Sequence, residues 1–109
     1  MDVRRRDVRY LGKGGNAYVL EWLQILRDNT GRIAILARID RLSEGNFGDH
    51  CSVGGGVWEL RVDFGPGYRI YYGEDGPTII LLICGGDKST QTKDIRKAQE
   101  VWAGHRRSK

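Results

Sequence analysis

The sequence predicts one α+β domain spanning residues 1–109, in which an antiparallel sheet packs against helices. Three observations indicate this fold. Apolar residues recur at helical spacing between residues 18 and 42, the period changes to two after residue 56, and helical spacing returns after residue 90. A chain of 109 residues is long enough for one modest core and too short for two. The expected order of elements is β-α-α-β-β-β-α.

The first part of the chain is expected to form one strand and two helices. Residues 8–11 predict a short strand, which a glycine-rich turn over residues 12–15 ends. The apolar face of the first helix consists of Tyr18, Trp22, Ile25 and Leu26. The segment Asp-Asn-Thr-Gly at 28–31 stops this helix and offers N-cap oxygens for a second. The apolar stripe of the second helix consists of Ile35, Leu36, Ile39 and Leu42.

The next part is expected to form a loop, a hairpin and a buried strand. Residues 45–56 are rich in glycine and polar side chains and predict the loop. Two alternating segments, 57–64 and 68–72, flank the turn Gly65-Pro66-Gly67 and predict the hairpin. Its apolar side carries Trp58, Leu60, Val62, Phe64, Tyr68, Ile70 and Tyr72, and its other side carries Glu59, Arg61, Asp63, Arg69 and Tyr71. The unbroken apolar run 78–84 predicts a central strand that is buried on both faces.

The last part is expected to form a basic helix. Ser89 or Thr90 can cap it, and its apolar positions are Ile95, Ala98 and Trp102. The net charge of the chain is +4, and residues 88–109 hold seven bases against two acids. A second basic cluster, Arg4–Arg6 with Arg9, lies nearby if the first strand runs beside the last one. Such clusters attract phosphate backbones, although a solvated helix face with a frayed tail has the same composition.

Composition excludes several other classes of protein. No apolar run approaches the roughly 20 residues that span a bilayer, so we expect no membrane association. The charged start of the chain lacks the apolar stretch of a secretory signal, which indicates a cytoplasmic protein. Cys51 and Cys84 stand apart, so we expect free thiols and no metal site. The segment 85–91 lacks the spacing of a nucleotide-binding loop, and we expect no cofactor.

The polar side of the hairpin holds the best candidates for chemistry. Alternation places Arg61 and Arg69 on one surface, where two guanidinium groups could bind a phosphate. The alternative is a lattice of ion pairs with Glu59 and Asp63 on a solvated face. Lys88 follows the buried strand at the start of the last helix, where free backbone N–H groups favour an anion. A nucleophile formed by the neighbours His50 and Cys51 is disfavoured, because no third group is evident to orient them.

Three stretches carry a resemblance to a known family. They are Asn-Phe-Gly-Asp at 46–49 with Val-Gly-Gly-Gly-Val-Trp-Glu-Leu-Arg at 53–61, Gly-Pro-Gly-Tyr-Arg-Ile-Tyr-Tyr at 65–72, and the run from Leu81 through Gly-Gly-Asp-Lys-Ser-Thr-Gln to Ile95. Residues 21–23 and 37–42 extend the match over nearly the whole chain. With these motifs in this order, the chain resembles the addiction-module killer branch of the RelE/ParE toxin superfamily, close to the HigB-like toxins.

This resemblance implies a RelE-like toxin of a type II toxin–antitoxin module. Such a toxin is a ribosome-dependent endoribonuclease that cleaves translated mRNA by attack of the ribose 2′-hydroxyl, with no metal. Its expected partners are a cognate antitoxin, often a HigA-like helix-turn-helix protein, together with the ribosome and mRNA. By motif, Arg69 matches the phosphate-stabilising arginine of the family, Lys88 matches a basic residue near the scissile phosphate, and Arg61 is a second phosphate contact. The expected RNA contacts are Tyr71, Gln91, Lys93 and Arg96.

Two departures from the family pattern and two other functions accompany this interpretation. RelE itself uses lysines on the first hairpin strand, where this chain has Val57 and Glu59, so the sequence identifies no proton acceptor. Relatives commonly have lysine at the position of Cys51. The ParE branch uses the same scaffold to inhibit DNA gyrase, because a fold does not fix a function. A gyrase inhibitor without nuclease activity and a degenerate toxin that only binds its antitoxin are the alternatives.

Overall fold

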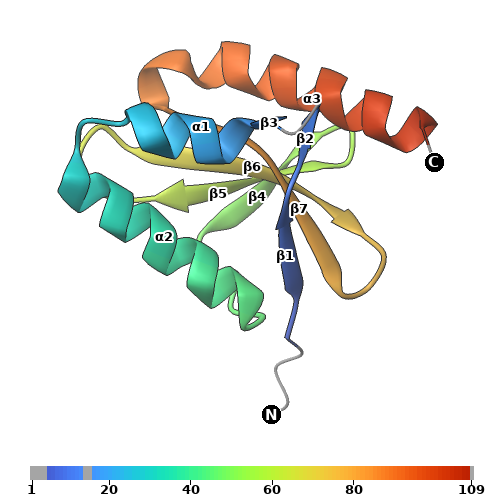
Figure 1. Cartoon of the computed structure of the whole chain (residues 1–109), viewed down its shortest axis with the longest axis horizontal. Helices are drawn as coiled ribbons and strands as arrows, with labels where there is room; N and C mark the ends of the chain where they lie inside the picture. The colour runs from blue at the N-terminus through green and yellow to red at the C-terminus, as the bar shows by residue number, and fades with distance from the viewer. Residues whose placement is uncertain (1–4, 14–15, 109) are drawn as a thin grey trace.

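The computed structural model describes residues 5–13 and 16–108 and confirms the predicted α+β fold. A five-stranded sheet in the order β1-β7-β6-β5-β4 has helices packed on both faces (Figure 1). Its strands are β1 (Asp7–Tyr10), β4 (His50–Gly54), β5 (Val57–Val62), β6 (Tyr68–Asp75) and β7 (Ile79–Asp87). The helices are α1 (Tyr18–Ile25), α2 (Asn29–Ser43) and α3 (Gln91–Arg107), and the 3-10 turn η1 (Lys88–Thr90) precedes α3. Strands β2 (Gly12–Lys13) and β3 (Asn16–Ala17) form a separate small ladder before α1.

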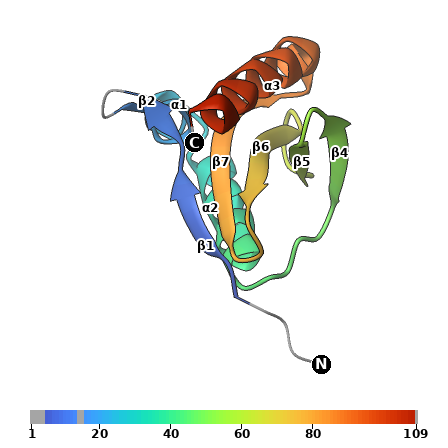
Figure 2. The same cartoon turned by 90° about the vertical axis from the view of Figure 1, so that its right-hand side faces the viewer.

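The first strand lies beside the last strand of the chain. β1 pairs in parallel with β7, whereas β4, β5, β6 and β7 pair with one another in antiparallel fashion. Figure 2 shows β1 and β4 at the two edges of the sheet. The first strand therefore runs beside the last strand, which is the condition for the two basic clusters to lie near each other. Arg4 of the first cluster lies outside the described residues.

Helices α1 and α2 pack on one face of the sheet. The buried side chains that they contribute are Val19, Leu23, Ile35, Ile39 and Leu42. Asp28 caps α2 by accepting a hydrogen bond from the backbone N–H of Gly31 at 2.9 Å, as the sequence predicted. The predicted stripes are wrong at two positions, because Ile25 is 77% exposed and Leu36 is 42% exposed. Ile25 is the last residue of α1 and extends beyond the sheet contact.

Helix α3 covers the opposite face of the sheet. The alternative interpretation of the hairpin, a lattice of ion pairs, had placed this face in solvent. Ala98 and Trp102 of α3 pack against Val57, Tyr71 and Ile83. A Cβ at Gly73 would lie 2.6 Å from the Trp102 ring, so this glycine lets the indole sit directly on the sheet. Strand β7 is buried on both faces as predicted, and it lies inside the sheet next to the middle strand β6. No helix in the described part of the chain is long and apolar enough to cross a membrane.

The predicted loop over residues 45–56 is partly wrong. Residues 50–54 form β4, which pairs with β5 through His50 opposite Leu60 and Cys51 opposite Glu59. The glycines at 54, 55 and 56 all have positive φ angles (92°, 66° and 82°) and form the turn between these strands. The high glycine content correctly predicted this turn. It also led to the prediction of a loop where the short edge strand β4 lies before the turn.

Candidate functional site

The three predicted catalytic residues line a single small pocket. Arg61 on β5 lies directly opposite Arg69 on β6 in the strand register. Lys88 follows β7, the next strand along the sheet. The pocket has a volume of about 160 Å³ and is lined by Asp49, Arg61, Val62, Asp63, Gly67, Arg69 and Lys88. Residues far apart in sequence thus bring three cations to one place.

The tight hairpin turn fixes the position of Arg69. Its Nη1 donates a hydrogen bond to the carbonyl oxygen of Gly67 at 2.9 Å. Gly67 has a φ of 81°, and a Cβ there would lie 3.2 Å from Nη1 of Arg69 and 3.8 Å from Cβ of Lys88. A side chain at position 67 would therefore be strained and would crowd the Arg69 guanidinium, while its contact with Lys88 would be ordinary.

Glu59 is the buried acid of the site. Its side chain is 1% exposed, whereas Arg69 is 12% and Arg61 is 41% exposed. Oε1 lies 3.1 Å from Nε of Arg61, and Oε2 lies 3.6 Å from Nε of Arg69. One carboxylate thus reaches both guanidinium groups from beneath them.

Two neutral donors complete the surroundings of Glu59. The hydroxyl of Tyr71 donates to Oε2 at 3.0 Å, and the amide Nε2 of Gln91 donates to the same oxygen at 2.9 Å. Burial raises the pKa of Glu59, but the hydrogen bonds from Gln91, Arg61 and Tyr71 and the charge of Arg69 outweigh it, so the pKa lies below its usual value. Burial and the neighbouring Glu59 charge raise the pKa of Tyr71, which keeps its hydroxyl protonated.

Tyr71 was predicted to contact RNA, and its burial contradicts that role. Its side chain is fully buried beneath α3 and offers no ring surface to a nucleotide. Gln91 is partly buried and its amide is committed to Glu59. Lys93 and Arg96 are exposed on α3 and lie outside the pocket lining. Of the four predicted RNA contacts, these last two present free surface.

The start of α3 carries its own negative charges, and the predicted anion site there is wrong. The carboxylate of Asp87 accepts from the backbone N–H of Ser89 at 2.8 Å and from its hydroxyl at 2.5 Å. Asp94 accepts from the hydroxyl of Thr90 at 2.5 Å. Asp87 therefore caps η1, whereas the predicted Thr90 is the N-cap residue of α3 and makes no capping hydrogen bond with its side chain. Lys88 serves the arginine pocket instead of a helix-end anion.

His50 and Cys51 point to opposite sides of β4 and form no catalytic pair. The His50 ring packs against Phe47 and Trp58, with ring centroids 5.4 Å and 5.5 Å apart. The Sγ atom of Cys51 lies 3.0 Å from Nη2 of Arg61 and 3.7 Å from Oε1 of Glu59. Cys51 therefore borders the candidate site at the position where a lysine was expected.

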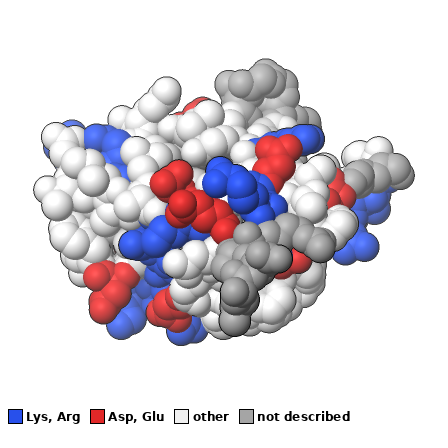
Figure 3. Space-filling model, turned by 90° about the horizontal axis from the view of Figure 1, so that it is seen from below, with Lys and Arg blue, Asp and Glu red and all other residues white. Residues whose placement is uncertain are grey.

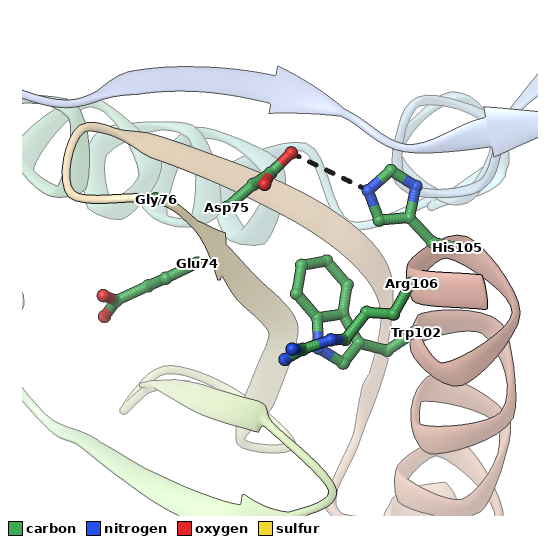
Figure 4. Close-up of a pocket in the computed structure, with 6 residues that line it drawn as sticks. All are labelled: Glu74, Asp75, Gly76, Trp102, His105 and Arg106. Atoms are coloured by element: carbon green, nitrogen blue, oxygen red, sulfur yellow. Dashed lines mark ion pairs between the residues drawn. The ribbon is translucent and has the colours of Figure 1, made fainter. Parts of the chain in front are cut away.

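A second pocket lies near the C-terminal end of α3. It has a volume of about 280 Å³ and is lined by Glu74, Asp75, Gly76, Trp102, His105 and Arg106 (Figure 4). His105 stacks on Trp102 with ring centroids 5.3 Å apart, and its Nε2 lies 3.9 Å from Oδ2 of Asp75. The pocket mixes acids and bases and contains none of the predicted site residues.

One face of the molecule carries mixed charge rather than a uniformly basic patch (Figure 3). On the face seen in Figure 3, basic and acidic side chains are interspersed. Within residues 5–13 and 16–108, no group of three or more His, Cys, Asp or Glu side chains could hold a metal ion. Local cations in the arginine pocket and on α3 are therefore the features suited to binding a phosphate.

Comparison with known proteins identifies the family. A family model described as phage derived protein Gp49-like (DUF891) matches residues 21–103. The chain belongs to this family. Gp49-like proteins are RelE-like, toxin-like killers of addiction modules, in agreement with the resemblance in the motifs. The matched segment of this Gp49-like chain includes Arg61, Arg69 and Lys88.

A relative supports the assignment of this Gp49-like chain. An uncharacterised protein of Haemophilus influenzae, strain Rd, is 50% identical over 78 residues, which cover 72% of this chain and 79% of the relative. The similarity supports a shared fold and family membership. It assigns no reaction to either protein.

Two site residues of the Gp49-like chain, Glu59 and Asp49, were not predicted from the sequence to be functional. Glu59 was considered as a member of a solvated ion-pair lattice and as a departure from the lysine of RelE, and Asp49 was noted only within a motif. Alternation already placed Glu59 beside Arg61, and the amphipathic last helix needed a sheet face to cover. Together these two signals could have indicated a buried acid.

Proposed function

We propose that this protein is a HigB-like toxin that cleaves translated mRNA on the ribosome in the cytoplasm. The observation that carries the proposal is the convergence of Arg61, Arg69 and Lys88 on one pocket within a Gp49-like chain. A scissile phosphodiester bears one negative charge and gains a second in the pentacoordinate transition state. Three cations gathered at one pocket would stabilise that developing charge more than the ground state.

The proposed reaction needs no metal. The ribose 2′-oxygen attacks its own 3′-phosphorus and loses its proton to a base, while the bond from phosphorus to the 5′-oxygen breaks and that oxygen gains a proton. The products are a 2′,3′-cyclic phosphate and a 5′-hydroxyl. Arg69 and Arg61 would hold the non-bridging oxygens, and Lys88 would stabilise the leaving oxygen or the phosphorane.

The proposed proton acceptor is one of the two accessible carboxylates of the pocket. Asp49 and Asp63 both line it and both reach solvent. Asp49 is the better placed, because its Oδ1 lies 3.5 Å from Nη1 of Arg61 and this contact holds it at the cations. Lys93 and Arg96 would extend the phosphate contacts along the RNA from α3.

The proposed partner is a HigA-like antitoxin with a helix-turn-helix fold, encoded beside the toxin. An acidic segment of the antitoxin across the arginine pocket would block RNA and offset the pocket charge. Gyrase inhibition is the second candidate, since the RelE/ParE superfamily supports both activities on one fold. The clustering of Arg61, Arg69 and Lys88 favours the nuclease, because phosphate chemistry requires these cations and simple inhibition does not.

The test is induction of the toxin without its antitoxin. We expect growth arrest and new 5′ ends within the codons of translated messages, measured by primer extension. A matched Arg69→Ala strain should grow and show intact messages. Intact messages in the wild-type strain, together with trapped gyrase–DNA complexes, would assign the protein to the gyrase inhibitors. Growth without either effect would assign it to the degenerate toxins.

A further inference from the structure

We propose that Glu59 is a positioning residue that fixes both arginines of the pocket and takes no proton from RNA. The inference rests on the proposed function and adds a residue for which the family resemblance supplies no role. Glu59 is the only acid among the described residues that is buried, and its carboxylate faces the two guanidinium groups.

The strand register creates a problem that Glu59 solves. Arg61 and Arg69 are directly opposite each other, and like charges at such positions repel. Glu59 lies two residues before Arg61 on the same face of β5. It offers Oε1 to Arg61 and Oε2 to Arg69, so a single negative charge bridges the pair. Glu59 alone leaves Lys88 and one arginine charge unbalanced. Two solvent-exposed carboxylates lie beside these charges in the pocket, those of Asp49 and Asp63.

The bridge differs between the two arginines and leaves a donor of Arg69 for a phosphate. Nε of Arg61 donates a hydrogen bond to Glu59, while its Nη2 donates to Cys51 and its Nη1 pairs with Asp49. Nε of Arg69 forms only an ion pair with Glu59 at 3.6 Å and makes no hydrogen bond within the described residues. Nη1 of Arg69 is committed to Gly67, and no hydrogen bond or ion pair within the described chain uses its Nη2. With Nη1 bonded to Gly67 and Nε facing the Glu59 charge, the planar guanidinium of Arg69 keeps Nη2 available as a donor.

Two further contacts prevent the carboxylate from turning. Tyr71 donates from β6 and Gln91 donates from the first turn of α3, both to Oε2. A carboxylate fixed from two other elements transmits its position to the arginines. The same contacts disqualify Glu59 as the base, because its lone pairs are occupied and its 1% exposure gives a ribose hydroxyl no access.

The experiment compares wild type with Glu59→Gln and Glu59→Asp in ribosome-dependent cleavage. Glu59→Gln keeps the shape and loses the charge, and we expect kcat to fall about a hundredfold, as for a displaced catalytic group. Glu59→Asp keeps the charge and should recover part of that loss. The acid limb of the plot of kcat/KM against pH should keep its midpoint in both variants, since this limb reports the proton acceptor, which is a different residue from Glu59.

A second measurement is independent of cleavage. In the RNA-free proteins, NMR should show slow hydrogen exchange at Nε of Arg61 in wild type and fast exchange in Glu59→Gln, while the melting temperatures show that both remain folded. Slow exchange in a wild-type protein that cleaves no RNA would reject the proposed nuclease activity and would still support the contact between Glu59 and Arg61. Unchanged Nε exchange, unchanged kcat in Glu59→Gln, or loss of the acid limb would each reject the positioning role.

Discussion

Arg69 shows how a polar strand face can supply a nearly buried cation. The alternation of side chains predicted that Arg69 and Arg61 share a surface, and the strand register confirms this. Alternation could not predict that Arg69 is only 12% exposed, because that depends on how α3 and the hairpin turn lie over the sheet. The long-range contact from Gln91 to Glu59 was hidden for the same reason.

Replacing Arg69 should abolish cleavage by removing donors that act in the transition state. Loss of one such donor typically costs about 2.7 to 4 kcal/mol, or roughly a hundredfold to a thousandfold in rate. Arg69→Lys should also be poor, because an ammonium lacks the planar fork of donors. Rates should be measured below the melting temperature of each variant. Wild-type activity in Arg69→Ala would refute the catalytic role.

The two accessible carboxylates of the pocket form a matched pair for testing the proton acceptor. We expect Asp49→Asn to lower kcat by roughly a hundredfold or more, the usual contribution of a general base, and Asp63→Asn to have a much smaller effect. The reason is that Arg61 holds Asp49 at the cations, whereas Asp63 forms no ion pair within the described residues. Single-turnover cleavage distinguishes them. A larger loss of kcat in Asp63→Asn than in Asp49→Asn would make Asp63 the proton acceptor in place of Asp49.

At the scale of elements, a shared aspartate joins α2 to the strand that carries Arg69. Asp28 caps α2 through Oδ1 and accepts a hydrogen bond from the Tyr68 hydroxyl through Oδ2 at 2.7 Å. The hydrogen bonds from Gly31 and Tyr68 lower the pKa of Asp28. Burial and the bond to Asp28 raise the pKa of Tyr68 to about 12. The cap was predictable from residues 28–31, whereas its partner 40 residues away was not.

Two tyrosine variants should separate this hydrogen bond from general packing. Tyr68→Phe should destabilise the fold by about 1 kcal/mol, the usual net value of such a bond. Tyr72→Phe is the control, because the buried Tyr72 hydroxyl has no partner within the described chain and its removal should be neutral or stabilising. Urea unfolding measures both free energies. Equal losses in the two variants would contradict a specific bond to Asp28.

Strand β4 shows why some elements escaped prediction. It has five residues, lies at the edge of the sheet and ends at Gly54, which two more glycines follow. Edge strands are short and often polar, so local sequence gives a weak strand signal and the pairing with β5 decides the structure. The longer strands and the three helices had clear local patterns, so the fold class could be predicted, although the buried residues of α1 are Val19 and Leu23 rather than those of the predicted stripe.

At the scale of the whole molecule, the buried Glu59 charge makes stability depend on acid pH. Its pKa is lowered in the folded protein, so its contribution is present above the unfolded pKa near 4.3 and is lost as the pH falls through the folded value. We expect the difference in unfolding free energy between wild type and Glu59→Gln to shrink as the pH falls from 7 to about 3. A difference independent of pH would show that Glu59 is not charged in the fold.

Antitoxin binding should depend on salt if it covers the arginine pocket. Screening by added salt weakens the attraction between exposed charges, so affinity should fall as ionic strength rises. Calorimetric titration of wild type and of Lys93→Glu at two salt concentrations provides the measurement. An affinity that changes neither with salt nor with the Lys93→Glu substitution would place the interface away from the pocket and α3.

The parallel pairing of β1 with β7 has a consequence for synthesis of the protein. Residue 7 pairs with residue 79, so an early segment must wait for a late one before the sheet can close. Contacts between distant segments form slowly because a long loop must be closed first. Chains emerge N-terminus first, so Lys88 and Gln91 leave the ribosome after every strand they complete. A nascent chain therefore lacks a finished pocket until the segment that carries Lys88 and Gln91 has been made.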